Sequence, residues 1–469
     1  MKVKFLGATK CVTGSCHMVT IDEVKILFDC GLFQSYDENQ YDNEVFNFEP
    51  KDIDFVILSH SHVDHSGRIP LLFKRGFKGR VICTKPTVDL SECLLKDAAK
   101  IQGEDTYFEN LKRQKKNLEA LQPLYELKDV EEAIEHFEGF DYGEDIRLTE
   151  NIYLKFEDAG HILGSAICEL SVNNFKGSNP KGEKIKIVFS GDIGNKNKDI
   201  LKDPHTGIEA DYLIMESTYG DKEHDEKDVY PEFLNIAKST VEAGGNLIIP
   251  CFSLGKTQEV IYMLNKFVEE GKLKDCSVFI DSPLASSLTE IFKKYEEYFD
   301  RAAQRLIDKG DDPLNFNGLH FVKTKEDIEE VNSVKKRAII IVAGGLHHGG
   351  RVANHLKNNL NREECGIIIT SYQGRESLGS QLLKGEKNLE ISGENVEVKA
   401  KVHYIGGLSC HADKNGLYQW VVNLKKKPKK IFLVHGEEEN IQCFYDKLVQ
   451  HGYEAITVDY QEEIILDEK

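Results

Sequence analysis

The sequence lacks long apolar runs, paired cysteines and linker-like tracts rich in Pro or Ser. No run approaches the roughly 20 apolar residues that cross a bilayer. The N-terminus, MKVKFLGATK, has no apolar stretch of the kind found in secretory signals, so we expect a cytoplasmic location. The 11 cysteines form no C-x-x-C pair and predict free thiols rather than a disulfide framework. Any metal site must therefore come from histidine and carboxylate.

The chain has no excess of positive charge to offer a polyanion. With 60 Lys and Arg against 79 Asp and Glu, its net charge is −19. Long-range repulsion of this sign slows association with nucleic acid. It does not exclude such a partner, because basic side chains can gather along one groove.

The patterning predicts an α/β protein with two integrated domains. A chain of 469 residues is too long for one compact core. Short runs of β-type residues dominate before residue 217, and the same pattern returns after residue 396. Between them, apolar strands alternate with helical patterns, which is typical of a parallel sheet. We therefore expect one domain from residues 1–217 and 396–469, with a second inserted at 218–395.

A dense cluster of metal-capable side chains follows the apolar run DFVILSH. His60, His62, Asp64 and His65 fall within six residues at the end of a strand expected to be buried on both faces. Imidazole and carboxylate suit zinc and related divalent ions. Structural zinc sites are usually rich in cysteine, so this set favours a catalytic site that keeps a water ligand.

This H-x-H-x-D-H motif resembles the signature of the metallo-β-lactamase superfamily. One position before the motif and three after it match the family in order, and each follows an apolar run. Asp29 matches the aspartate that supports the metal loop, and His161 in DAGHILGSA the next histidine. Asp192 in VFSGDIG matches the bridging aspartate, and His435 in IFLVHGE the last histidine.

The resemblance implies two zinc ions per chain and a hydrolytic reaction on a phosphoester or acyl bond. Two adjacent metal ions activate a shared water and stabilise attacking and leaving oxygens. The implied ligands are His60, His62 and His161 for one ion, Asp64, His65 and His435 for the other, and Asp192 between them.

The middle of the chain is similar to the inserted domain of the β-CASP nucleases. The similar segments are IPCFSLGKTQEVIYML, DSPLASSLTEIF, AGGLHHGGRVANHL and SYQGRESLGSQLLKG. The fold implied is a metallo-β-lactamase αββα sandwich with an inserted parallel-sheet β-CASP domain. Family members acting on DNA commonly lack the last histidine, so His435 favours RNA.

Two further residues match catalytic motifs of that family. Glu216 in LIMESTYG matches its first acidic motif, and His411 in LSCHADKNGL its histidine motif. An imidazole near the metals can protonate a leaving oxygen, and a neighbouring carboxylate can raise its pKa. We expect His411 to be the general acid and Glu216 its orienting partner, with a plain salt bridge or a structural hydrogen bond as the alternatives. Asp64 or Asp192 is expected to hold the nucleophile.

Substrate phosphate is the expected partner of a glycine-rich turn at Gly349, Gly350 and Arg351. Backbone N–H groups and a guanidinium suit phosphate oxygens, although such a turn is also common without a ligand. The paired histidines His347 and His348 are not part of the family's usual sequence motif, and we do not assign them as ligands. His17 is interpreted as a strand residue rather than a ligand.

The expected function is hydrolysis of single-stranded RNA, by endonucleolytic cuts in preference to a 5′→3′ exonuclease mode. A DNA nuclease, a hydrolase of small thioesters or lactams, and a non-catalytic scaffold for RNA processing remain as alternatives. Membrane association is not expected. The sequence does not indicate an RNA sequence preference or the metal loaded. A homo-oligomer and a monomer are both compatible with it.

Overall fold

The computed structural model describes residues 1–34, 41–173, 184–224, 229–344, 346, 350–370 and 377–466. The chain divides into two compact units. Unit 1 comprises residues 1–197, 203–223 and 411–469, and unit 2 comprises residues 198–202 and 224–410. No helix in the described ranges is long and apolar enough to cross a membrane.

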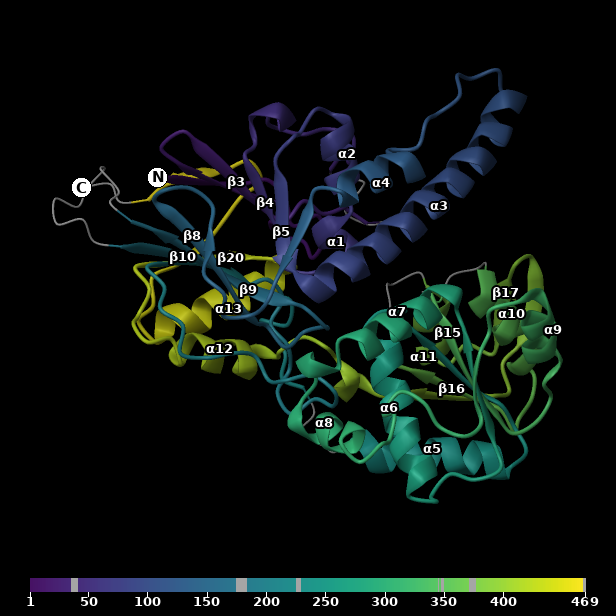
Figure 1. Cartoon of the computed structure of the whole chain (residues 1–469). Coiled ribbons are helices and arrows are strands. Elements are labelled where there is room, and N and C mark those ends of the chain that lie inside the picture. Colours follow the sequence, from purple (N-terminus) through teal and green to yellow (C-terminus); the bar gives the residue numbers. More distant parts are fainter. Residues whose placement is uncertain are drawn as a thin grey trace. The chain divides into compact units, whose positions relative to one another are not determined.

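Unit 1 is a sandwich of two sheets (Figure 1). The first sheet contains, in spatial order, β22 (Glu463–Ile465), β1 (Lys2–Phe5), β2 (His17–Ile21), β3 (Val24–Phe28), β4 (Phe55–Ile57), β5 (Arg80–Thr84) and β6 (Phe137–Phe140). The second contains β21 (Ala455–Thr457), β20 (Lys430–Val434), β11 (Tyr212–Glu216), β10 (Ile185–Phe189), β9 (Ala166–Val172), β8 (Ile152–Asp158) and β7 (Ile146–Arg147).

Three apolar layers hold the sandwich together. Side chains of both sheets, among them Phe28, Phe156 and Phe432, share one buried core. The outer face of the first sheet packs against α2 (Ile69–Lys74), α3 (Lys85–Lys115) and α4 (Leu127–Ile134). The short helix α1 (Val63–Ser66) precedes α2. The outer face of the second packs against α12 (Lys414–Val422) and α13 (Glu438–Gln450). These layers confirm the predicted αββα sandwich.

The strand before the metal motif is central in its sheet. β4 pairs in parallel with both β3 and β5, and both of its faces are covered, because Ile57 lies in the core between the sheets and Val56 in the layer against the helices. This position explains the continuous apolar run DFVILSH. The residues after the motif have the sequence pattern of one helix from His65 to Lys74, but the structure divides it: α1 ends at Ser66 and α2 begins at Ile69. Between them, buried Arg68 donates from Nε to the carbonyl oxygen of Gly31 at 2.7 Å.

Unit 2 is built on a parallel sheet. Its strands lie in the order β14 (Leu319–Phe321), β13 (Ser277–Asp281), β15 (Ala338–Ala343), β12 (Leu247–Cys251), β16 (Gly366–Ile369) and β19 (Lys401–Tyr404). The helices are α5 (Val229–Glu242), α6 (Lys256–Glu269), α7 (Pro283–Lys294), α8 (Arg301–Ile307), α9 (Lys325–Ser333), α10 (Gly350–Asn359) and α11 (Leu378–Leu383). A hairpin of β17 (Asn388–Ile391) and β18 (Glu394–Glu397) completes the unit. The parallel sheet confirms the predicted fold of the insert.

Candidate metal centre

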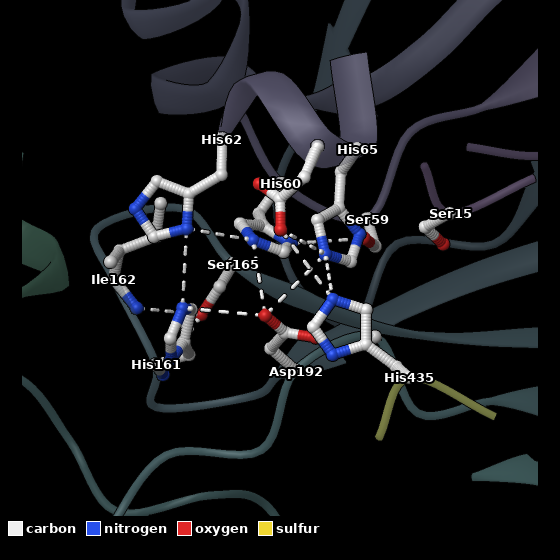
Figure 2. Close-up of polar contacts among 12 residues, drawn as sticks. Ser15, Ser59, His60, His62, His65, His161, Ile162, Ser165, Asp192 and His435 are labelled. Carbon is white, nitrogen blue, oxygen red and sulfur yellow. Dashed lines mark hydrogen bonds and ion pairs between the residues drawn. The ribbon is translucent and has the colours of Figure 1, made fainter. Parts of the chain in front are cut away.

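The candidate ligands all follow strand ends of unit 1. The motif at residues 60–65 follows β4, and Asp64 and His65 lie on α1. His161 follows β8, Asp192 follows β10 and His435 follows β20. Figure 2 shows the side chains of its labelled histidines and of Asp192 pointing toward a common point. The structure therefore brings together residues spread over most of the chain.

The first group consists of His60, His62, His161 and Asp192, whose ligand atoms lie within 4.8 Å of one another. Nδ1 of His62 lies 3.1 Å from Nε2 of His60 and 3.3 Å from Nε2 of His161. Oδ2 of Asp192 lies 3.6 Å from Nε2 of both His60 and His161. Three nitrogens and one carboxylate oxygen thus surround one position.

The second group consists of Asp64, His65 and His435. Nε2 of His65 lies 3.1 Å from Nε2 of His435, and Oδ2 of Asp64 lies 3.7 and 3.5 Å from these two nitrogens. Asp192 reaches this group as well, with Oδ2 3.5 Å from His65 Nε2 and Oδ1 3.6 Å from His435 Nδ1. Its carboxylate therefore faces both groups.

The chemistry of this donor set fits divalent cations. Burial lowers the pKa of His60 and His161 well below the usual value, and that of His62 to about 4, which leaves neutral rings with a free lone pair. Oδ1 of Asp192 is buried and has no hydrogen-bond partner among the described residues. A buried carboxylate oxygen in that state is costly unless a cation compensates it.

Asp29 orients His65 of the second group. It is fully buried, with a positive φ of 59°. Its Oδ1 accepts from the backbone N–H of Ser59 at 2.8 Å, and its Oδ2 accepts from the hydroxyls of Ser59 and Ser15 at 3.0 and 3.1 Å. Oδ2 also lies 2.7 Å from His65 Nδ1, which leaves Nε2 of that ring for a metal.

Glu216 and His411 lie beside the cluster. Glu216 ends β11 and is 1% exposed; its Oε1 accepts from the N–H of Ile193 at 2.7 Å. His411 Nδ1 lies 3.4 Å from Glu216 Oε1 and 4.0 Å from Asp192 Oδ2. Burial lowers the pKa of His411, but the charge and hydrogen bond of Glu216 and the charges of Asp192 and Asp64 together outweigh it, and the pKa rises to about 9. The imidazole is therefore protonated at neutral pH.

The sequence did not reveal several supporting side chains. Oγ1 of Thr218 lies 3.1 Å from His435 Nδ1, and Oγ of Ser165 accepts from the N–H of His161 at 3.0 Å. Glu216 also belongs to a third metal-capable group, with Asp192 and His435, so its carboxylate could itself be a cation ligand. Hydroxyl residues are common in loops. The only sequence signal for Thr218 and Ser165 is that they lie close along the chain to Glu216 and His161.

The residues expected to hold phosphate lie in unit 2. Gly350 begins α10 with a φ of +78°, and Arg351 donates from Nη1 to the buried carboxylate of Asp281. His355 Nε2 lies 2.7 Å from the other oxygen of Asp281. This carboxylate offsets the charge of Arg351. Gly349, His347 and His348 lie outside the described residues.

His17 lies in β2 and belongs to none of the metal-capable groups of the described residues. Its ring is fully buried 5.6 Å from the rings of Phe5 and Phe189, and neither nitrogen has a partner among the described residues. Burial lowers its pKa to about 3, so the ring is neutral.

Replacing His17 with leucine is expected to stabilise unit 1 by about 1 kcal/mol, because a buried polar group without a partner costs about 1–3 kcal/mol. The chain's one tryptophan, Trp420, lies buried in α12 of unit 1 and reports its unfolding by fluorescence. A urea midpoint above that of the wild type would agree with this account. A lower midpoint for leucine than for a His17→Asn control would mean that the ring nitrogens are satisfied.

Comparison with known proteins agrees with this fold. Family models match residues 18–177 as a metallo-beta-lactamase superfamily domain, 257–382 as a Beta-Casp domain, and 395–458 as a Zn-dependent metallo-hydrolase RNA specificity domain. A crystal structure of a protein of unknown function from Enterococcus faecalis has a similar fold, with a TM-score of 0.54, 14% identity and 99% coverage of both chains.

Two curated relatives align over nearly the whole chain. Ribonuclease TTHA0252 of Thermus thermophilus is 33% identical over 97% of both chains. Transcription termination factor FttA of Methanocaldococcus jannaschii is 30% identical over 95% of this chain and 68% of its own length. Fold and site define a metal-dependent hydrolase of the metallo-β-lactamase superfamily. Within it, the chain belongs to the β-CASP family.

Proposed function

We propose that this protein is a zinc-dependent ribonuclease that hydrolyses phosphodiester bonds of single-stranded RNA, chiefly by endonucleolytic cuts. The observation that carries this proposal is the pair of His411 and Glu216 beside Asp192. A hydrolase of thioesters has no need of such a proton donor, because a thiolate leaves without a proton. Similarity to a ribonuclease and to the RNA specificity domain supports the same substrate.

The two ligand groups would each hold one zinc ion, with the Asp192 carboxylate between them. When bound, the ions supply an activated water and positive charge for the phosphoryl oxygens. Asp29 fixes the ring of His65, and Ser165 fixes the backbone of His161. The chain thereby holds its ligands in place before substrate arrives.

His411 would supply the proton for the leaving oxygen. Its Nδ1 faces Glu216, so Nε2 is the atom that donates. Glu216 is itself held by the backbone N–H groups of Ile193 and Thr218, at 2.7 and 3.1 Å. This support fixes the carboxylate in place and thereby holds the imidazole in one orientation. The expected products are a 5′-phosphate and a 3′-hydroxyl.

Incubation with a 5′-labelled single-stranded RNA tests the proposal, beside DNA of the same sequence and a thioester. We expect internal cuts in RNA that vanish with a chelator and with Asp64→Ala, whereas Asp446→Ala on the exposed surface of α13 leaves them unchanged. Removal of single nucleotides from the 5′ end would instead assign the exonuclease mode. A protein measured to hold two zinc ions per chain that cleaves only DNA or thioester would contradict the proposal.

A further inference from the structure

The C-terminal half of α3 leaves the body of unit 1. Buried residues of this helix end at Ala99, and every residue from Lys100 to Lys115 is at least partly exposed. Figure 1 shows this end of α3 standing away from both sheets of the unit. We call residues 100–127 the arm. Its loop folds back on α3, where the Asn110 side chain makes two hydrogen bonds with the backbone of Leu121.

The arm carries much of the exposed apolar surface. Among the described residues, seven of the fourteen exposed large hydrophobic side chains belong to it, and these are Ile101, Tyr107, Phe108, Leu111, Leu118, Leu121 and Leu127. Phe108 is 59% exposed and Tyr107 60%. An open groove of about 710 Å³ lies beside them, lined in part by Gly103 and Tyr125. Clustered exposure of this kind marks a surface that another molecule covers.

One face of the arm has the pattern of a helix-pairing seam. With 3.6 residues per turn, positions 101, 104, 105, 108, 111, 112 and 115 share one side of α3, and all of them are exposed. Ile101, Phe108 and Leu111 form an apolar ridge along it. Asn110 and Arg113, which hold the loop, lie on the opposite side. The seam is therefore free of the arm's own loop.

The charges on this seam are complementary to those of a second, antiparallel copy. Acidic Glu104 and Asp105 lie toward its N-terminal end, and basic Lys112 and Lys115 lie toward its C-terminal end. A two-fold axis between Phe108 and Leu111 would place each acidic pair opposite a basic pair of the other copy. The apolar ridges would meet at the axis. Such an isologous contact closes as a dimer.

We propose that the arm is a self-association surface, on which α3 of one copy pairs antiparallel with α3 of a second copy. RNA would meet repulsion from Glu104 and Asp105, and a lipid surface would have to bury these carboxylates. Contacts of less than about 1,200 Å² in total are usually transient, and two helical heptads fall in that class. The dimer is therefore reversible and concentration-dependent. The proposal does not depend on RNA cleavage.

Sedimentation velocity of the full chain without RNA, over about a hundredfold range of concentration, tests it. We expect the wild type to shift from monomer to dimer. Two charge-reversed variants, Glu104→Lys/Asp105→Lys and Lys112→Glu/Lys115→Glu, should each bind themselves at least about tenfold more weakly. Mixed together, they carry opposite charges on the seam and should form a heterodimer.

Two further variants separate the seam from general effects. Phe108→Ser/Leu111→Ser should abolish the dimer, and Lys238→Glu on the surface of α5 should not change it. Unchanged Trp420 fluorescence will establish that unit 1 is folded in each. A folded wild type that stays monomeric throughout, or a dimer that survives both charge reversals, would overturn the proposal. Loss of RNA binding instead of dimer in these variants would assign the arm to RNA.

Discussion

Changing Asp192 to asparagine is expected to lower the rate of RNA cleavage by at least about 10³-fold, the scale found when one preorganised electrostatic group is removed. The Asp192 carboxylate lies within 3.6 Å of imidazole nitrogens of His60, His65, His161 and His435. Asparagine keeps the shape but removes the charge. Histidine rings then dominate the cluster, and its attraction for divalent cations falls.

Metal content and rate, measured on the same preparation, check this expectation. The variant should hold less zinc per chain than the wild type, and added zinc should restore the rate only in part. Asp446→Asn is the matched control, because its carboxylate is exposed on α13. A variant with the metal content and the rate of the wild type would mean that Asp192 does not face the ions.

The order of the motifs along the chain was enough to predict the cluster, for a structural reason. His60, His161, Asp192 and His435 each follow an apolar run, and each run proved to be a strand of the sandwich. The loops after these strands meet at one edge of the unit. Side chains that open such loops therefore converge, although as many as 370 positions separate His65 from His435.

Other features depend on tertiary contacts that local patterning does not contain. Arg68 divides the helix after the motif because its guanidinium donates to the carbonyl of Gly31. Arg351 was expected to face phosphate from its residue type, but its pairing with Asp281 needed the neighbouring strand of the parallel sheet. Lys426 lies in the basic run 425–430 (KKKPKK) and pairs with Asp211 and Glu209, at 3.0 Å each. The composition of this run does not predict these partners.

The arm is a case in which composition misleads. Its basic residues from Lys112 to Lys116 resemble an ordinary solvated helix face. Their meaning changes once Phe108 and Leu111 are found exposed between them and the acidic pair. Exposure of an apolar side chain is a property of the folded chain, so the seam could be found only in the structure.

Replacing His411 with glutamine is expected to lower kcat for RNA by about 10²- to 10⁴-fold, the usual contribution of general acid catalysis. The protonated ring lies beside Glu216 and would donate to the leaving ribose oxygen. The loss should nearly vanish with bis(p-nitrophenyl) phosphate, whose phenolate leaves without a proton. His451→Gln, an exposed histidine at the end of α13, is the control.

Equal losses on both substrates would assign His411 a structural role instead. Such a result would fit a ring that only packs against His161, at 4.4 Å between centroids.

The pH profile of Glu216→Gln separates the two partners. The active form of His411 carries the proton, so the rate is present below its pKa of about 9 and is lost as the pH rises through that value. Glu216 raises this pKa, and glutamine removes the negative charge that does so. The alkaline limb of kcat should therefore move to lower pH. If the limb stays in place while kcat falls, Glu216 acts on the metal ligands rather than through His411.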